Sequence, residues 1–183
     1  MTEYIQNNHF ESQKPIGKPS VITWQGVRMV RSHSIQAVAK ELINMSANQE
    51  MVSVNAIGKQ STGKTELLKT LSHLIHKHAK IPYQISYFGK EAMLNLEETV
   101  KNLKPTNQII IFDDIAFLKA SATTKQIDQI QQVLSVIRHL PGGKDVRIIL
   151  MKSFQYSKSI PPFLRQNDVT FLASVDDNEI DSL

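Results

Sequence analysis

The 183-residue sequence contains no cysteine. Disulfide bonds, thiolate nucleophiles and cysteine-ligated zinc or iron are therefore excluded. No apolar run approaches the roughly 20 residues that cross a bilayer, and the first residues lack the basic start and apolar middle of a secretory signal. From these absences we expect a cytoplasmic protein without a membrane span, whose chemistry comes from oxygen and nitrogen groups.

The composition is that of a folded, water-soluble protein. Hydrophobic residues make up 41% and charged residues 21% of the chain, which fits neither a disordered chain nor a coiled coil. Residues 1–20 are polar and contain Pro15 and Pro19, so we expect a flexible N-terminal arm followed by a single domain over residues 21–183. A net charge of +4 is compatible with a polyanionic partner.

Strand-like and helix-like segments alternate along the domain. A short hairpin or an edge strand is predicted over residues 21–30, and Ser34 is the expected N-cap of a helix that runs to Met45. Further helices are predicted over 64–80, 90–104 and 124–140, and further strands over 51–57, 83–88, 108–112, 146–151 and 168–173. This alternation predicts an α/β fold with a mainly parallel sheet covered on both faces.

A glycine-rich segment is the strongest functional signal. It matches G-x-x-x-x-G-K-[ST], follows a predicted strand and opens a predicted helix, so its main-chain amides and the helix dipole can face an anion. Lys64 is expected to contact the β- and γ-phosphates and Thr65 to bind Mg²⁺. The pattern predicts ATP and Mg²⁺ as cofactors, bound by Gly58, Lys59, Gln60, Ser61, Thr62, Gly63, Lys64 and Thr65.

Two aspartates follow the apolar strand that ends at Phe112. The carboxyl end of a strand in an open α/β sheet is where ligands bind, so Asp113 and Asp114 are expected to face the phosphate loop. In this interpretation Asp113 holds Mg²⁺, usually through water, and Asp114 orients or deprotonates the attacking water. The alternative is an Asp-Asp turn that caps the next element.

Together these motifs resemble P-loop NTPases, and the extra strand between them resembles the group that includes RecA, AAA+ and FtsK/HerA proteins. The segments Ile137-Arg138-His139, Arg147–Met151 and Ile160–Asn167 resemble the FtsK/HerA superfamily, most of all the small viral genome-packaging ATPases of the poxvirus type. The resemblance implies a three-layer, additional-strand fold and an ATP-driven translocase of double-stranded DNA. It also implies a homo-oligomeric ring, a capsid or portal partner, and work in the host cytoplasm or virion.

The same resemblance implies two further catalytic groups. One is an arginine that reaches the site of a neighbouring subunit, and the candidates are Arg138 and Arg165. The other is a polar sensor at the end of the fourth strand, where the family usually has glutamine. Lys152 and Ser153 stand there in this sequence, so the sensor is expected to be Ser153 or Gln155. Alternatively, Arg138 covers a helix C-terminus and Arg165 solvates a surface turn.

Three other functions fit the same two motifs. An AAA+-like loader or remodelling ATPase requires a helical lid after the last strand, and we expect none because about ten residues follow that strand. A small nucleotide or metabolite kinase requires an arginine-rich lid, which the sequence between the fourth strand and the end does not contain. A nucleotide-gated binding module would hydrolyse little ATP.

Overall fold

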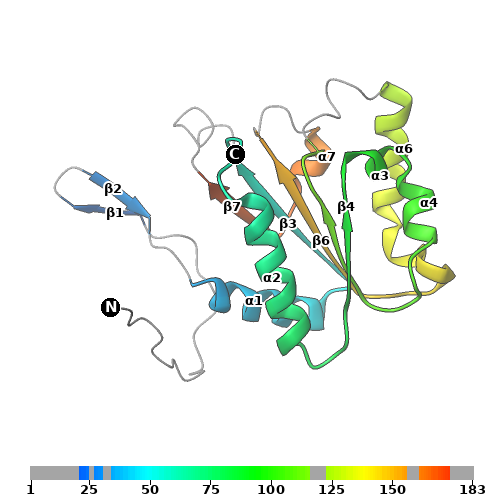
Figure 1. Cartoon of the computed structure of the whole chain (residues 1–183), viewed down its shortest axis with the longest axis horizontal. Helices are drawn as coiled ribbons and strands as arrows, with labels where there is room; N and C mark the ends of the chain where they lie inside the picture. The colour runs from blue at the N-terminus through cyan, green and yellow to red at the C-terminus, as the bar shows by residue number, and fades with distance from the viewer. Residues whose placement is uncertain (1–20, 25–26, 31–33, 116–122, 156–160, 174–183) are drawn as a thin grey trace.

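The structure of the protein is a computed structural model that describes residues 21–24, 27–30, 34–115, 123–155 and 161–173. Strands β1 (Val21–Trp24) and β2 (Val27–Val30) pair antiparallel in a sheet of their own, which confirms the predicted hairpin (Figure 1). The predicted arm over residues 1–20 lies outside the described residues.

Five strands form the main sheet, in the order β4-β5-β6-β3-β7. All four pairings between neighbours are parallel, which confirms the predicted sheet. Because the strands are parallel, their carboxyl ends lie along one edge, where β3 leads into α2 (Figure 1). The bounds are Met51–Gly58 for β3, Gln84–Phe88 for β4, Gln108–Phe112 for β5, Ile148–Phe154 for β6 and Val169–Ala173 for β7.

Helices cover both faces of this sheet, so the domain has three layers. The α-helices in the described residues are α1 (Ile35–Asn48), α2 (Lys64–His78), α3 (Lys90–Leu94), α4 (Leu96–Lys101), α6 (Thr124–Ser135) and α7 (Pro162–Arg165). Two short 3₁₀ helices follow α6, η2 (Ile137–His139) and η3 (Pro141–Gly143). As predicted, Ser34 caps α1: its hydroxyl oxygen accepts a hydrogen bond from the Ala37 amide at 3.2 Å.

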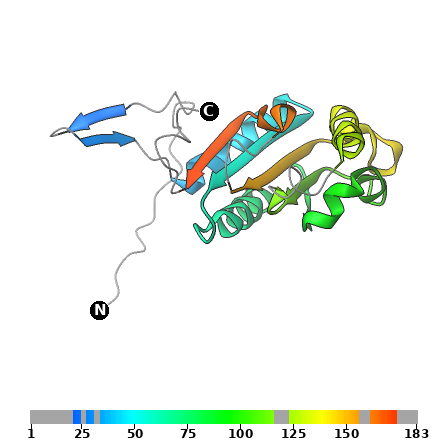
Figure 2. The same cartoon turned by 90° about the horizontal axis from the view of Figure 1, so that it is seen from above.

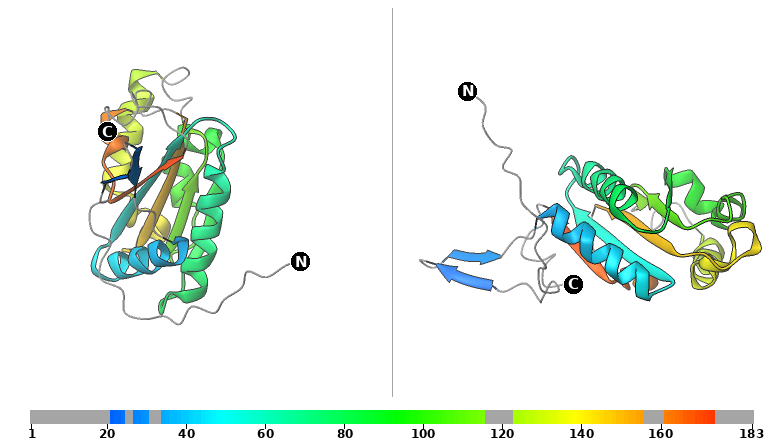
Figure 3. Two further views of the ribbon diagram at one scale, coloured as in Figure 1. Left: turned by 90° about the vertical axis from the view of Figure 1, so that its left-hand side faces the viewer. Right: turned by 90° about the horizontal axis from the view of Figure 1, so that it is seen from below.

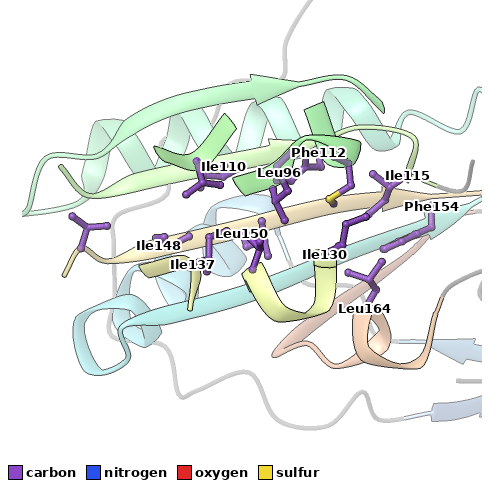
Figure 4. Close-up of a cluster of buried hydrophobic side chains, with 14 of the residues drawn as sticks. Leu96, Ile110, Phe112, Ile115, Ile130, Ile137, Ile148, Leu150, Phe154 and Leu164 are labelled. Atoms are coloured by element: carbon purple, nitrogen blue, oxygen red, sulfur yellow. The ribbon is translucent and has the colours of Figure 1, made fainter. Parts of the chain in front are cut away.

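The two faces of the sheet have separate apolar cores. Apolar residues of α1 and α2 pack on one face, and the two helices lie next to each other in the right-hand view of Figure 3. On the other face, α6 and α7 lie opposite α2 (Figure 2). Figure 4 shows this second core, in which Ile130 of α6 and Leu164 of α7 pack with strand residues such as Phe154. No helix in the described part of the chain is long and apolar enough to cross a membrane.

The prediction of one continuous helix over residues 90–104 is wrong, because the segment forms two short helices, α3 and α4. It is interrupted at Asn95, whose φ and ψ angles are −115° and 40°, and α4 ends at Lys101. Asparagine disfavours the helix interior because its side chain competes for main-chain hydrogen bonds. Across the break, the hydroxyl of Thr99 donates to the carbonyl of Ala92 at 3.2 Å.

The helix predicted over residues 124–140 is shorter than expected, because α6 ends at Ser135. Val136 has a φ of −122° and leaves the helical conformation, which places Arg138 in η2 rather than in the last turn of α6. After η2 the chain turns through Gly142 and Gly143, which both have positive φ angles, a conformation that glycine adopts without strain.

A lysine is buried within the apolar core next to α7. Lys152 lies on β6 and is 2% exposed. Its ammonium group donates to the carbonyl of Leu164 at 3.3 Å, and the side-chain amide of Asn55 donates to the same carbonyl at 3.1 Å. Burial lowers the pKa of Lys152 to about 8, against the opposing effect of the Asp168 carboxylate.

We predict that Lys152→Met stabilises the protein at pH 7. The pKa of Lys152 is about 8 in the folded protein and 10.5 for an unperturbed lysine, so between these values the unfolded chain binds the proton more tightly. Stability therefore rises with pH over this interval in the wild type. A methionine side chain at this position carries no such penalty, and Asn55 still donates to the Leu164 carbonyl.

Thermal unfolding of both proteins at pH 7, 8.5 and 10 measures the effect. The melting temperature of Lys152→Met should exceed that of the wild type at pH 7, and the difference should shrink as the pH approaches 10. Leu150→Met, on the same face of the same strand, is the control for altered packing without a change of charge. A lower melting temperature for Lys152→Met at pH 7, or a difference that is constant with pH, would contradict the prediction.

Candidate nucleotide site

The loop between β3 and α2 has the geometry of an anion-binding turn. Ser61 and Gly63 have φ angles of 61° and 81°, so both adopt the left-handed backbone conformation. Left-handed residues in such a turn let successive main-chain N–H groups point into one concave anion site. The loop leads directly into α2, whose N-terminus favours negative charge. At the other end of the loop, a Cβ on Gly58 would lie 1.8 Å from the carbonyl oxygen of Ala173, so only glycine fits beside β7.

The ammonium group of Lys64 lies inside this loop. It donates to the carbonyls of Gly58 at 3.0 Å and Lys59 at 2.7 Å. Burial lowers the pKa of Lys64, and the nearby carboxylates of Asp113 and Asp114 oppose that shift. The loop therefore has its cation in place, and both predicted aspartates are close enough to interact with it.

The carboxylate of Asp113 faces the phosphate loop, as the sequence predicted. The Thr65 hydroxyl donates to its Oδ2 at 2.8 Å and the Ser153 hydroxyl to its Oδ1 at 2.5 Å, while the Tyr87 hydroxyl also donates to Oδ2. Burial alone would raise the pKa of Asp113, but the hydrogen bonds from Ser153, Tyr87 and Thr65 outweigh it and hold that pKa below its ordinary value. Asp113 is therefore an oriented carboxylate that is ionised at neutral pH.

Asp114 lies next to Asp113 in a less common backbone conformation. Its φ angle is 49°, a region that few residues other than glycine adopt. Two side chains of the β6 end hold it there: the Ser153 hydroxyl oxygen accepts from the Asp114 amide at 2.8 Å, and the Gln155 amide donates to the Asp114 carboxylate at 3.3 Å. Both sensor candidates therefore contact the aspartate pair, and Ser153 bridges its two members.

The chemistry of these groups suits Mg²⁺ bound together with a nucleotide. Mg²⁺ prefers oxygen ligands and is usually held by one or two carboxylates, water and substrate phosphates. Here a hydroxyl and a carboxylate, from Thr65 and Asp113, meet beside the phosphate loop. Among the described residues, no group of three or more His, Asp or Glu side chains is placed to hold a metal by itself.

Of the two predicted arginines, Arg138 is the one whose side chain the structure describes, and it lies away from this cluster. Arg138 forms an ion pair with Glu50, with 2.6 Å between Nε and Oε2. Glu50 precedes the first residue of β3 and the phosphate loop follows the last, so this pair lies at the opposite edge of the sheet. Arg165 is the last residue of α7, and its side chain lies outside the described residues. A role in a neighbouring subunit stays a prediction for both.

Tyr87 is the site residue that sequence reasoning missed. It lies near the carboxyl end of the edge strand β4 and is 46% exposed, with the Lys69 ammonium 5.4 Å from the centroid of its ring. Burial of the hydroxyl and its bond to Asp113 raise the pKa of Tyr87 above its ordinary value. The strand pattern predicted β4, but only the pairing of β4 with β5 places this side chain against Asp113.

Comparison with known proteins finds similarity in structure only. No family model and no curated protein matches the sequence. The ORC2 protein of Aeropyrum pernix in its ADP form aligns with a TM-score of 0.59 and 15% identity over 76% of this chain and 47% of that one. RuvB of Thermotoga maritima aligns with a TM-score of 0.54 and 13% identity over 75% of this chain and 42% of that one.

A third structure, the genome packaging NTPase of Sulfolobus turreted icosahedral virus 2 in complex with ATP-γS, gives a TM-score of 0.49 and 17% identity. That alignment covers 73% of this chain and 80% of the viral one. The chain spans less than half the length of ORC2 and of RuvB. At these identities the similarities to ORC2 and RuvB show the fold alone, which is the α/β fold of P-loop NTPases, and they leave the FtsK/HerA assignment unconfirmed.

We predict that Ser153→Ala destabilises the protein by about 1–3 kcal/mol, because it removes both the hydrogen bond to Oδ1 of Asp113 and the hydrogen bond from the Asp114 amide. Ser53→Ala is the matched control: Ser53 is a buried strand serine whose hydroxyl has no partner among the described residues. Urea unfolding of both variants measures the difference. Equal effects of the two substitutions would show that the bridge contributes nothing.

Proposed function

We propose that the chain binds ATP with Mg²⁺ at the phosphate loop and hydrolyses it. The observation that supports this most strongly is the 2.8 Å contact between the Thr65 hydroxyl and the Asp113 carboxylate. The loop motif and the acidic strand end are 48 residues apart in sequence. Their side chains nevertheless meet at one point, in the arrangement that phosphoryl transfer requires of a metal-binding pair.

In this proposal each group of the loop binds part of the triphosphate. The main-chain amides after Gly58 and the N-terminus of α2 bind phosphate oxygens. Lys64 exchanges its two carbonyl acceptors in the loop for the more negative β- and γ-phosphate oxygens. Thr65 and Asp113 hold Mg²⁺, which neutralises the charge that develops on the transferred phosphoryl group.

Asp114 is the proposed general base or orienting group for the attacking water. Its carboxylate and its main chain are held by Gln155 and Ser153, so the group does not need to be ordered when ATP binds. Ser153 also contacts Asp113, which links the metal ligand to the proposed base. We assign the sensor role to these two residues together, with Ser153 as the bridge.

The finer proposal is that the ATPase is a subunit of a homo-oligomeric ring that translocates or packages double-stranded DNA. Hydrolysis needs a cation beside the transferred phosphoryl group, and the planar guanidinium of arginine matches the phosphoryl oxygens best. The two arginines whose side chains the structure describes are engaged elsewhere: Arg138 pairs with Glu50, and Arg147 donates to the carbonyls of Ser46 and Ala47. An arginine from a neighbouring copy, for which we favour Arg165, would complete the site.

The remaining parts of this proposal rest on the sequence. The arrangement of residues 137–167 resembles small viral packaging ATPases, and the net charge of +4 suits a polyanion. A viral packaging enzyme would act in the host cytoplasm or virion with a capsid or portal partner. A translocase relies on contacts to the DNA backbone, so no sequence preference is expected.

An AAA+-like remodelling ATPase is the second candidate. It is supported by the similarity in fold to ORC2 and RuvB, each with a TM-score above 0.5. Both functions share the proposed ATP site. They differ in whether ATP hydrolysis moves the protein along a continuous duplex. This movement can be measured as the displacement of a third DNA strand that is bound to the duplex.

We predict that double-stranded DNA stimulates ATP hydrolysis by the assembled protein and that Arg165→Ala lowers this stimulated kcat by about 10³-fold. The affinity for ATP should stay at the wild-type value, because the arginine acts on the site of a neighbouring copy. Steady-state ADP release with and without duplex DNA measures the stimulated kcat, and equilibrium nucleotide binding measures the affinity for ATP. Arg138→Ala is the comparison variant and should keep most of the activity, because the structure pairs Arg138 with Glu50.

Lys64→Ala is the control for the ATP site itself and should abolish binding or turnover. Hydrolysis that ignores DNA and is unaffected by Arg165→Ala would contradict the ring motor while leaving the ATPase intact. ADP formation that depends on a small acceptor instead of DNA would indicate a kinase. Failure of the wild-type protein to bind ATP would overturn the proposal as a whole.

A further inference from the structure

Tyr87 makes a contact that neither the phosphate loop nor the acidic strand end accounts for. It lies on β4 opposite Ile111 of β5, and the pairing of the two strands extends to a main-chain hydrogen bond from Asp113 to Phe88 at 3.0 Å. Because side chains alternate along a strand, Tyr87, Ile111 and Asp113 share the face of the sheet that α2 covers. The backbone thus brings the Tyr87 hydroxyl to the Asp113 carboxylate.

The hydrogen bonds of Asp113 divide into those that metal binding disturbs and those that it does not. Oδ2 accepts from Thr65 and Tyr87, and Oδ1 accepts from Ser153. If Thr65 and Asp113 held Mg²⁺ together, the Thr65 hydroxyl oxygen would be a metal ligand, and its hydrogen bond would compete with the metal for the lone pairs of Oδ2. Tyr87 belongs to neither the loop nor the ligand pair, so it can keep its bond to Asp113 when Mg²⁺ is bound.

The position of Tyr87 argues against a role in packing alone. The residue is almost half exposed and is not part of either apolar core, yet its hydroxyl is turned inward onto the carboxylate. One side of the ring is near the Lys69 ammonium, which comes from α2, the helix that the phosphate loop opens. The side chain therefore joins the edge strand, the acidic strand end and the nucleotide-binding helix.

We propose that Tyr87 is a positioning residue for the metal, which holds Oδ2 of Asp113 at the angle where it meets Mg²⁺ or a water of its shell. This inference rests on the proposed ATP and Mg²⁺ site and adds a residue that the loop and acid motifs do not contain. Hydrogen-bond partners of metal ligands fix the orientation of those ligands, and their loss typically weakens metal affinity about 10- to 100-fold.

The test is the Mg²⁺ dependence of nucleotide binding in Tyr87→Phe, which removes the hydroxyl and keeps the ring. A fluorescent ADP analogue is titrated into each protein without Mg²⁺ and then at increasing Mg²⁺, so that no turnover is needed. The affinity without Mg²⁺ should equal that of the wild type. The Mg²⁺ concentration that gives half of the metal-dependent increase in affinity should rise about tenfold.

Tyr83→Phe is the matched control, because the Tyr83 hydroxyl is buried and has no hydrogen-bond partner among the described residues. It should leave the Mg²⁺ dependence unchanged, and unfolding temperatures verify that both variants are folded. Wild-type or tighter Mg²⁺ dependence in Tyr87→Phe would overturn the inference and leave the proposed ATP site standing. If the wild-type protein bound the analogue without any response to Mg²⁺, both proposals would fall.

Discussion

The hydrogen bond between Thr65 and Asp113 is the interaction on which the site depends. It joins the first turn of α2 to the end of β5, and two strands of the sheet, β3 and β5, must be placed correctly for it to form. They are not neighbours, because β6 lies between them. The parallel order brings all three carboxyl ends to one edge, so that the loop, the aspartates and the end of β6 surround a single point.

The central strand β6 serves both faces of the sheet through two successive residues. Ser153 points toward the α2 face and bridges the two aspartates, whereas Lys152 points the other way and bonds to the end of α7. A buried lysine costs stability, and the site beside it is built from charged and hydroxyl groups held close together. We therefore expect the region around the proposed site to be less stable than an all-apolar core would be.

The sequence predicted much of this arrangement because local patterns carry it. The loop motif identified Lys64 and Thr65, the apolar run before two acids identified Asp113, and the alternation of elements predicted the parallel sheet. What it did not predict has two causes, one in the pairing of distant segments and one in local hydrogen bonding. The contact of Tyr87 with Asp113 follows from the register of β4 against β5, and the interruption at Asn95 from local competition that a helical period does not reveal.

The most direct test of the account is calorimetric titration of a non-hydrolysable ATP analogue, with and without Mg²⁺, into the wild type and Asp113→Asn. The account predicts that Mg²⁺ tightens binding to the wild type and that this gain is largely lost in Asp113→Asn, because the amide no longer offers a charged oxygen beside Thr65. An equal gain from Mg²⁺ in both proteins would mean that the metal is held elsewhere, and the acidic strand end would not be part of a nucleotide site.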